Sequence, residues 1–221
     1  MLTLVCSSAK MPERHFQQAR ARETFERIRR ETIRAFAAQG PHKARISEIV
    51  ERAGVTQPTF YQCFSGKMQA YEELLSNFRL QLDTLNTSLR MRVDPEETRP
   101  YPARVAASIG RILDFLAEDR DLTEIGFFQE PGASESRAVL IESIKRNIAA
   151  EQAIGLVRAD IDAHRIAQIY VAIISTMARE RENEEQRPLR ANDCAIILCE
   201  GLAPHENLKK HPCPSPDLSR K

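Results

Sequence analysis

The chain has 221 residues, of which 42% are apolar and 29% charged, so it can bury a core and does not have the composition of a disordered chain. Its net charge of +1 hides an uneven distribution, because residues 1–70 hold 12 Lys and Arg against 6 Asp and Glu, whereas residues 71–221 hold 20 against 25. A basic amino-terminal module joined to an acidic remainder is typical of a DNA-binding head carried by a separate body.

Cysteine usage and hydropathy exclude secreted and membrane-spanning classes. The cysteines are odd in number and form no C-x-x-C pair, which argues against a disulfide framework and for a reducing, cytoplasmic compartment. No apolar run approaches the roughly 20 residues that span a bilayer. The five cysteines are Cys6, Cys63, Cys194, Cys199 and Cys213.

The amino-terminal residues are expected to form a disordered leader over 1–16, because MLTLVCSSAK lacks the basic and long apolar regions of a signal peptide. Either Met1 or Met11 can be the physiological start. Gly is scarce, and apolar residues recur at steps of three and four from there on, so we predict an all-α fold with about nine helices. The first helix is predicted over 17–39 and ends at Gly40–Pro41.

Residues 45–67 predict two short helices joined by a tight turn. The first carries Ile49 and Val50 on one face and ends at Gly54, a residue suited to a left-handed helix end. Thr56 is placed as the N-cap of the second helix, with Pro58 in its first turn. Two helices joined in this way form a helix-turn-helix, whose second helix enters the DNA major groove. A plain helical hairpin without DNA explains the apolar positions, but not an outward face of amide, hydroxyl and phenol groups.

The stretch AGVTQPTFYQCFSGK, residues 53–67, resembles the DNA-binding signature of the tetracycline-repressor (TetR) family of bacterial transcription regulators. It departs from the family pattern at Ala44–Arg45, where a Thr pair is usual, at Cys63 and at Met68. The resemblance implies a three-helix DNA-binding domain over 17–70 and a helical ligand-binding and dimerisation domain over 71–203. Residues 204–221, rich in proline, are expected to form a flexible tail.

The resemblance and the chemistry of the side chains together predict the DNA contacts. Gln57 is expected to bond adenine through its amide, and Pro58 and Tyr61 offer apolar surface for a thymine methyl. The short hydroxyl residues and Lys67 suit phosphate oxygens. The full predicted set is Arg45, Ser47, Thr56, Gln57, Pro58, Thr59, Tyr61, Gln62 and Lys67.

A long helix from about 65 to 92 connects head and body without a Gly/Ser linker, so the two parts should be rigidly coupled. Apolar stripes on this helix and on the helices after it predict an effector pocket, although the same residues also suit a plain core. The candidates are Leu82, Leu85, Tyr101, Ile109, Phe115, Phe127 and Phe128, with Gln129 as a polar anchor.

The last two helices are apolar over most of their girth, so they need partners on more than one side. Internal packing could satisfy both sides. The family resemblance instead implies a homodimer in which these helices pair across a two-fold axis. The predicted interface residues are Ile166, Ile169, Tyr170, Ile173, Met177, Cys194, Ala195, Leu198 and Leu202.

The sequence contains no nucleophile elbow, phosphate-binding loop, dinucleotide motif or zinc-spaced cluster, so we expect no catalytic residue, metal or cofactor. The function it predicts is a ligand-responsive repressor that binds a palindromic double-stranded DNA operator as a homodimer and is released by a small-molecule effector. The alternative is a helical interaction or scaffold protein that does not bind DNA.

Overall fold

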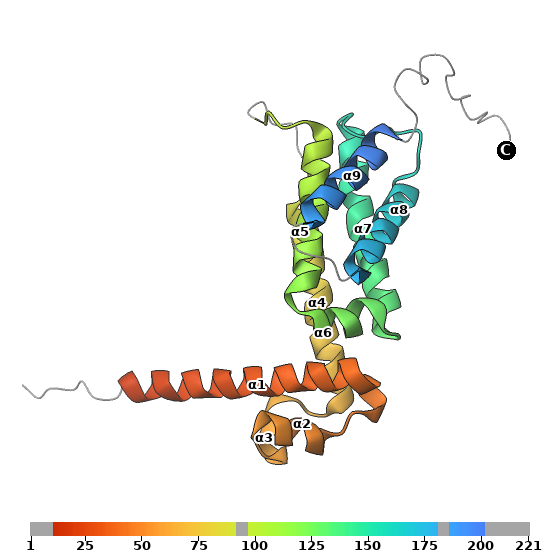
Figure 1. The fold of residues 1–221 in the computed structure, drawn as a ribbon. Coiled ribbons are helices and arrows are strands. Elements are labelled where there is room, and N and C mark those ends of the chain that lie inside the picture. Colours follow the sequence, from red (N-terminus) through yellow and green to blue (C-terminus); the bar gives the residue numbers. More distant parts are fainter. Residues whose placement is uncertain (1–10, 92–96, 181–185, 202–221) are drawn as a thin grey trace, which may run out of the picture.

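The computed structural model describes residues 11–91, 97–180 and 186–201. These ranges form nine α-helices and one short π-helical segment and contain no strand (Figure 1), which confirms the predicted all-α fold. None of the helices in these ranges is long and apolar enough to cross a membrane.

The head consists of α1 (Met11–Lys43), α2 (Ile46–Ala53) and α3 (Gln57–Cys63). Helix α1 begins at Met11, within the predicted leader of residues 1–16, and residues 1–10 lie outside the described residues. The predicted break at Gly40 is confirmed, because its φ of 74° and ψ of 160° are not helical. Residues 41–43 therefore form a separate last turn, which aims the chain back toward α2.

The core of the head is aromatic and aliphatic. Ile28 and Phe36 of α1, Ile49 of α2 and Phe60 of α3 are fully buried. Each comes from the apolar side of an amphipathic stretch, so three short faces bury one another. Thr32 is also fully buried. Its hydroxyl donates to the Ile28 carbonyl at 2.7 Å, so its burial leaves no hydroxyl donor unpaired.

Helix α4 (Lys67–Ser88) runs without interruption from the head into the body (Figure 1). The predicted domain boundary at residues 70/71 therefore falls inside a continuous helix. Its first turns pack with the head through Ala70 and Tyr71, and its later turns bury Phe78 and Leu82 in the body. Because no linker separates the two parts, a movement of α4 is transmitted to the head.

The body contains α5 (Tyr101–Glu118), α7 (Gly132–Ala153), α8 (Ala163–Arg179) and α9 (Arg187–Glu200). Between α5 and α7, the short helix α6 (Arg120–Thr123) is followed directly by the π-helical segment η1 (Glu124–Phe128). Helix α7 packs against α4 and α8, and α9 packs against α5. Residues 202–221, which include Leu202 and the predicted tail, lie outside the described residues.

The amino terminus of α7 approaches α4 closely at Gly132. A Cβ atom there would lie 2.4 Å from Leu75 Cδ1 and 2.8 Å from the Ile125 carbonyl oxygen. Only glycine fits this crossing without a shift of backbone, so the contact among α4, η1 and α7 depends on it.

Candidate nucleic-acid interface and ligand grooves

The turn between α2 and α3 has the geometry that the sequence predicts. Gly54 adopts the left-handed conformation (φ 64°, ψ 40°), and its N–H donates to the Glu51 carbonyl at 3.1 Å. The Val55 N–H donates to the Val50 carbonyl at 2.9 Å. These bonds satisfy carbonyls at the end of α2 and set the angle at which α3 leaves.

Helix α3 buries Phe60 and leaves most of its remaining side chains on the outside. Tyr61 is 53% exposed. Gln57, Pro58 and Gln62 are also exposed, and Thr59 is half-buried. No acidic side chain belongs to α3. The helix therefore presents amide, hydroxyl and phenol groups, which can meet base edges and phosphates without electrostatic repulsion.

Thr56 occupies the predicted N-cap position of α3 but makes a different contact from the usual one. Its side chain accepts no backbone N–H. Its hydroxyl instead lies 3.1 Å from the Thr59 hydroxyl. At the start of α3 the Thr59 N–H donates to the Thr56 carbonyl at 3.0 Å and Pro58 has no N–H, which leaves the Gln57 N–H for an external acceptor such as a phosphate oxygen.

Lys67 does not point away from the protein as the predicted phosphate contact would. Its Nζ donates to the carbonyl oxygens of His42 at 2.6 Å and Ala44 at 2.9 Å, and the side chain is partly buried. The ammonium group therefore joins the start of α4 to the segment after the α1 kink. This geometry gives Lys67 a structural role as a clamp within the protomer, and its role as a DNA contact stays a prediction.

Arg45 and Ser47 lie at the start of α2 and are exposed. Arg45 occupies the N-cap position without a side-chain cap bond, as its departure from the family pattern implies. Its guanidinium lies 3.9 Å from the Glu48 carboxylate, an exposed pair of little strength. Arg45 can therefore exchange this partner for a phosphate.

Two grooves border the body. The first, of about 730 Å³, lies between α1 and the body, and Arg34, Leu116, Phe128 and Arg179 are among its lining residues. The second, of about 700 Å³, lies between α4 and α5 and is lined by Leu80, Leu85, Phe115 and others. Both volumes fall within the range of about 300–1,000 Å³ that small-molecule sites occupy.

The structure separates the residues of the predicted effector pocket. Leu82, Ile109 and Phe127 are fully buried core residues. Leu85 and Phe115 line the groove between α4 and α5, whereas Phe128 and Gln129 line the groove beside α1. Tyr101 lies elsewhere, with its hydroxyl on Glu151. The three-and-four spacing of apolar residues predicted which side chains face inward. It did not predict that these side chains contact different parts of the body.

Gln129 connects the body to the head. Its Nε2 donates to the Ala37 carbonyl of α1 at 2.9 Å and to Glu124 Oε1 at 3.2 Å. The amide nitrogen of Gln129, the residue predicted as a polar anchor, is therefore engaged by the protein itself. This bond joins the end of η1 to α1, close to the kink that leads into α2.

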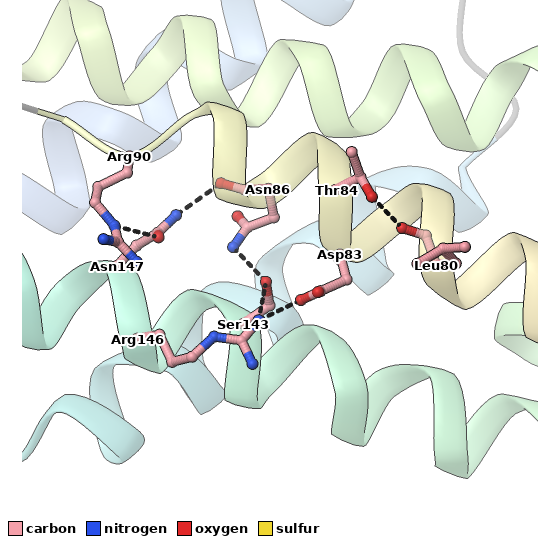
Figure 2. A network of polar contacts seen from close by, with 8 residues as sticks. All are labelled: Leu80, Asp83, Thr84, Asn86, Arg90, Ser143, Arg146 and Asn147. Carbon is pink, nitrogen blue, oxygen red and sulfur yellow. Dashed lines mark hydrogen bonds and ion pairs between the residues drawn. The ribbon is translucent and has the colours of Figure 1, made fainter.

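A buried polar seam between α4 and α7 escaped the sequence analysis (Figure 2). Asn86 Nδ2 donates to Ser143 Oγ at 3.0 Å, and Asn147 Nδ2 donates to the Asn86 carbonyl at 2.7 Å. Arg90 Nε donates to Asn147 Oδ1 at 3.1 Å, and Arg146 pairs with Asp83. Because an unpaired buried amide is costly, the seam holds the distal part of α4 in one register on α7.

Glu151 closes the same interface with a buried carboxylate. It accepts from the Met91 N–H at 3.1 Å and from the Tyr101 hydroxyl at 3.2 Å, so it joins the end of α4 to the start of α5. Burial raises the pKa of Glu151, an effect reduced by these bonds and by the charges of Arg104 and Arg90. Burial and the neighbouring carboxylate also raise the pKa of Tyr101.

We predict that Glu151→Gln removes a pH-dependent loss of stability. A raised pKa means that the folded state holds the proton more tightly than the unfolded state, so the free energy of unfolding falls as pH rises from the unfolded pKa to the folded one. The variant should unfold at equal or higher urea concentration than the parent at neutral pH, and the difference should vanish in acid. Urea unfolding followed by circular dichroism across pH measures this, and a parent that gains stability through that range would contradict it.

The outer faces of α8 and α9 expose large apolar side chains. The exposed fractions are 48% for Ile169, 39% for Ile196, 46% for Ile197 and 68% for Leu189. The two helices are neighbours, because Cys194 Sγ lies 3.6 Å from Met177 Sδ. Three-and-four spacing places Leu189, Ile196 and Ile197 on one side of α9. A side of α9 that exposes several large apolar side chains is a candidate interaction surface.

Two of the predicted interface residues are buried within the protomer. Ala195 is fully buried and Met177 is 9% exposed. Ala195 therefore belongs to the protomer's own core, and Met177 has only a small accessible surface. Ile166, Tyr170, Ile173, Cys194 and Leu198 are half-buried, and Ile169 is exposed.

Comparison with known proteins supports the same interpretation of the head. The family model described as "Bacterial regulatory proteins, tetR family" matches residues 28–74, which include α2 and α3. The chain is 34% identical over 152 residues to the HTH-type transcriptional regulator YdgC of Bacillus subtilis (strain 168), covering 69% of this chain and 77% of the relative. It is 25% identical over 142 residues to the HTH-type transcriptional activator FasR of Mycolicibacterium smegmatis, covering 63% of this chain and 62% of that protein.

Solved structures share the fold. The transcriptional regulator FadR from Bacillus subtilis, crystallised in complex with stearoyl-CoA, superimposes with a TM-score of 0.60 and 18% identity. The match covers 81% of this chain and all of that one, so the arrangement of head and body is common to both.

Proposed function

Because the chain belongs to the TetR family of bacterial transcription regulators, we propose that it acts as a ligand-responsive repressor, binding a palindromic operator as a homodimer. The observation that carries this proposal is the outward face of α3, which exposes Gln57, Pro58, Tyr61 and Gln62 and has no acid. The proposed protein works on chromosomal DNA in the cytoplasm and performs no catalysis.

The exposed apolar faces of α8 and α9 support the homodimer. Ile169, Ile196 and Ile197 would be buried by a second copy, and a two-fold interface would use the same patch on both protomers. A two-fold dimer places two recognition helices about one turn of DNA apart, roughly 34–36 Å, which suits a palindrome.

The proposed regulation acts through α4. Its distal part is held on α7 through Asn86 and Asn147. Its first residue, Lys67, bonds the head through the carbonyl oxygens of His42 and Ala44. An effector that displaces α4 or its neighbours would therefore change the spacing of the two heads. The effector shifts this equilibrium only by its difference in affinity for the two arrangements. FadR, crystallised with stearoyl-CoA, provides a precedent within the same fold for a ligand-bound regulator.

The decisive experiment compares Gln57→Ala with the parent on operator and scrambled duplexes. Gln57 is expected to read one base in each half-site, so its loss should cost about 1–3 kcal/mol per contact on the operator and almost nothing on the scrambled duplex. Operator DNA is taken from the intergenic region upstream of the gene. Fluorescence anisotropy over a salt series gives both affinities.

A control variant and two alternative outcomes show whether the effect of Gln57→Ala is specific to base reading. Gln81→Ala, an exposed glutamine on α4 beside the second groove, should leave both affinities unchanged. Equal losses on both duplexes would make Gln57 a positioning residue rather than a base reader. A parent without salt-dependent duplex binding would favour the helical scaffold alternative, since phosphate neutralisation gives a steep salt slope.

The direction of regulation is tested by transcription. FasR is described as an activator, so a repressor role for this chain needs its own measurement. We expect transcription from the operator-bearing promoter to rise when the gene is deleted. A fall on deletion would assign activation instead.

A further inference from the structure

The groove between α1 and the body combines an apolar floor with a basic rim. Leu113 and Leu116 of α5 and Met177 of α8 form part of the floor, beside the ring of Phe128. Four arginines reach the same groove from four different helices: Arg34 of α1, Arg120 of α6, Arg179 of α8 and Arg187 of α9. Segments far apart in the sequence thus converge on one amphipathic space of about 730 Å³.

Two of these arginines pair with carboxylates that do not line the groove. Arg34 pairs with Glu31 at 2.8 Å, and Arg187 pairs with Asp114 at 2.7 Å. Both partners lie outside the set of groove-lining residues. The Asp114 side chain is 62% exposed. An exposed carboxylate contributes little free energy to its pair, so a better-placed anion can replace Asp114 at Arg187.

The other two arginines have open hydrogen-bonding capacity. Within residues 11–91, 97–180 and 186–201, no carboxylate lies at ion-pair distance from Arg120 or Arg179. The Arg179 guanidinium stacks over Phe128, with Cζ 4.8 Å from the ring centre. Stacking fixes the plane of the guanidinium and leaves its edge N–H groups for a ligand.

The groove also contains three carboxylates, two of which are engaged. Glu180 pairs with Arg190, which lies outside the lining set. Glu124 Oε1 accepts from Gln129 at 3.2 Å. Asp121 is the third and is exposed. Among the described lining residues, four arginines therefore stand against three carboxylates.

We propose that this groove binds a small organic anion with an apolar chain, a carboxylate or a phosphate monoester. The guanidinium groups of Arg120 and Arg179 hold the anionic group, because arginine matches such groups with paired N–H donors. The apolar chain covers the floor formed by Leu113, Leu116 and Met177. This inference names the ligand class for the regulator proposed above, and only its effect on DNA rests on that function.

Occupancy of the groove would influence the head directly. Arg34, Ala37 and Ala38 form its α1 side, and Gln129 bonds the Ala37 carbonyl across the junction. A ligand here touches both the head and the body. It therefore favours one head–body arrangement and changes the affinity for operator by the same coupling free energy.

The test uses octyl phosphate, with 1-octanol and octyltrimethylammonium as neutral and cationic probes of equal chain length. Isothermal titration calorimetry on the full chain should show octyl phosphate binding at least about tenfold more tightly than either. Arg120→Gln and Arg179→Gln should each weaken octyl phosphate by roughly tenfold or more and leave 1-octanol unchanged, because each removes a charge-assisted bond. Arg179→Lys should retain part of the affinity.

Arg111→Gln is the matched control, since Arg111 is an exposed arginine on α5 that lines the other groove. It should bind octyl phosphate like the parent. Circular dichroism confirms that each variant is folded. Equal binding of octyl phosphate and 1-octanol, or equal affinity of the Arg179→Gln and Arg111→Gln variants, would overturn the proposed site.

DNA binding is measured separately by anisotropy on the operator duplex. Saturating octyl phosphate is expected to change operator affinity in the parent but not in Arg179→Gln. An unchanged affinity at saturation would overturn the coupling to the head. A chain that binds octyl phosphate through these arginines but binds no duplex would retain the site and refute the proposed function instead.

Discussion

Replacing Ile197 by glutamate is expected to give folded monomers that no longer bind an operator. Ile197 is 46% exposed in the protomer and lies on the outer face of α9 with Ile196. Glutamate is a good helix former, so the helix itself should persist. In a two-fold interface each substitution appears twice, and each unpaired carboxylate that the interface buries costs several kcal/mol. We expect the dimer dissociation constant to rise by at least about 10³-fold.

Analytical ultracentrifugation and operator binding measure the two consequences together. A monomer carries one recognition helix, so its affinity should fall toward that for non-specific duplex, about 10³-fold or more below the dimer's. Leu80→Glu is the control, because Leu80 is 64% exposed on α4 and lies outside α8 and α9. If the Ile197 variant sedimented as a folded dimer, the interface would lie on another face.

Replacing Lys67 by methionine is expected to destabilise the head without altering the salt slope of DNA binding. The substitution keeps the apolar stem but leaves the carbonyl oxygens of His42 and Ala44 without their donor. Hydrogen bonds from charged groups contribute about 1.5–3 kcal/mol, so the variant should unfold at lower temperature and bind all duplexes more weakly. A phosphate contact would instead lower the slope of log K against log salt by roughly 0.9 for each protomer.

Arg45→Gln gives the opposite signature and serves as the comparison. The Arg45 side chain is 77% exposed, and its distance from Glu48 is 3.9 Å. Its removal should lower the salt slope and leave the melting temperature almost unchanged. A Lys67 variant with a reduced slope and parental stability would instead confirm Lys67 as a DNA contact.

The sequence alone predicted the helix-turn-helix, because the features that determine it lie within about twenty residues. Gly54 ends α2, Pro58 starts α3, and Phe60 and Phe64 turn inward through the periodicity of a single helix. These are local preferences of backbone and side chain, which do not depend on contacts with distant segments. The outward face that carries Gln57 and Tyr61 follows from the same periodicity.

Contacts between distant segments were decided only by the tertiary structure. Asn86 meets Ser143 and Asn147, and Gln129 meets Ala37, across separations of 57, 61 and 92 residues. Nothing in the local pattern of either partner indicates the other. The same limitation explains Lys67, whose basic side chain suited a phosphate until the fold placed two carbonyl oxygens beside it.

The apolar stripes of the body show how far periodicity reaches. Apolar residues around most of the circumference of α8 and α9 predicted that each helix packs on two sides. They did not predict that Ala195 faces the protomer's core while Ile197 faces outward. The candidate pocket residues were inward-facing, yet they divide among the core, two grooves and the Glu151 contact. Periodicity states which side of a helix avoids water. Only the crossing of one helix on another determines which neighbour that side meets, because many helix arrangements bury the same stripes equally well.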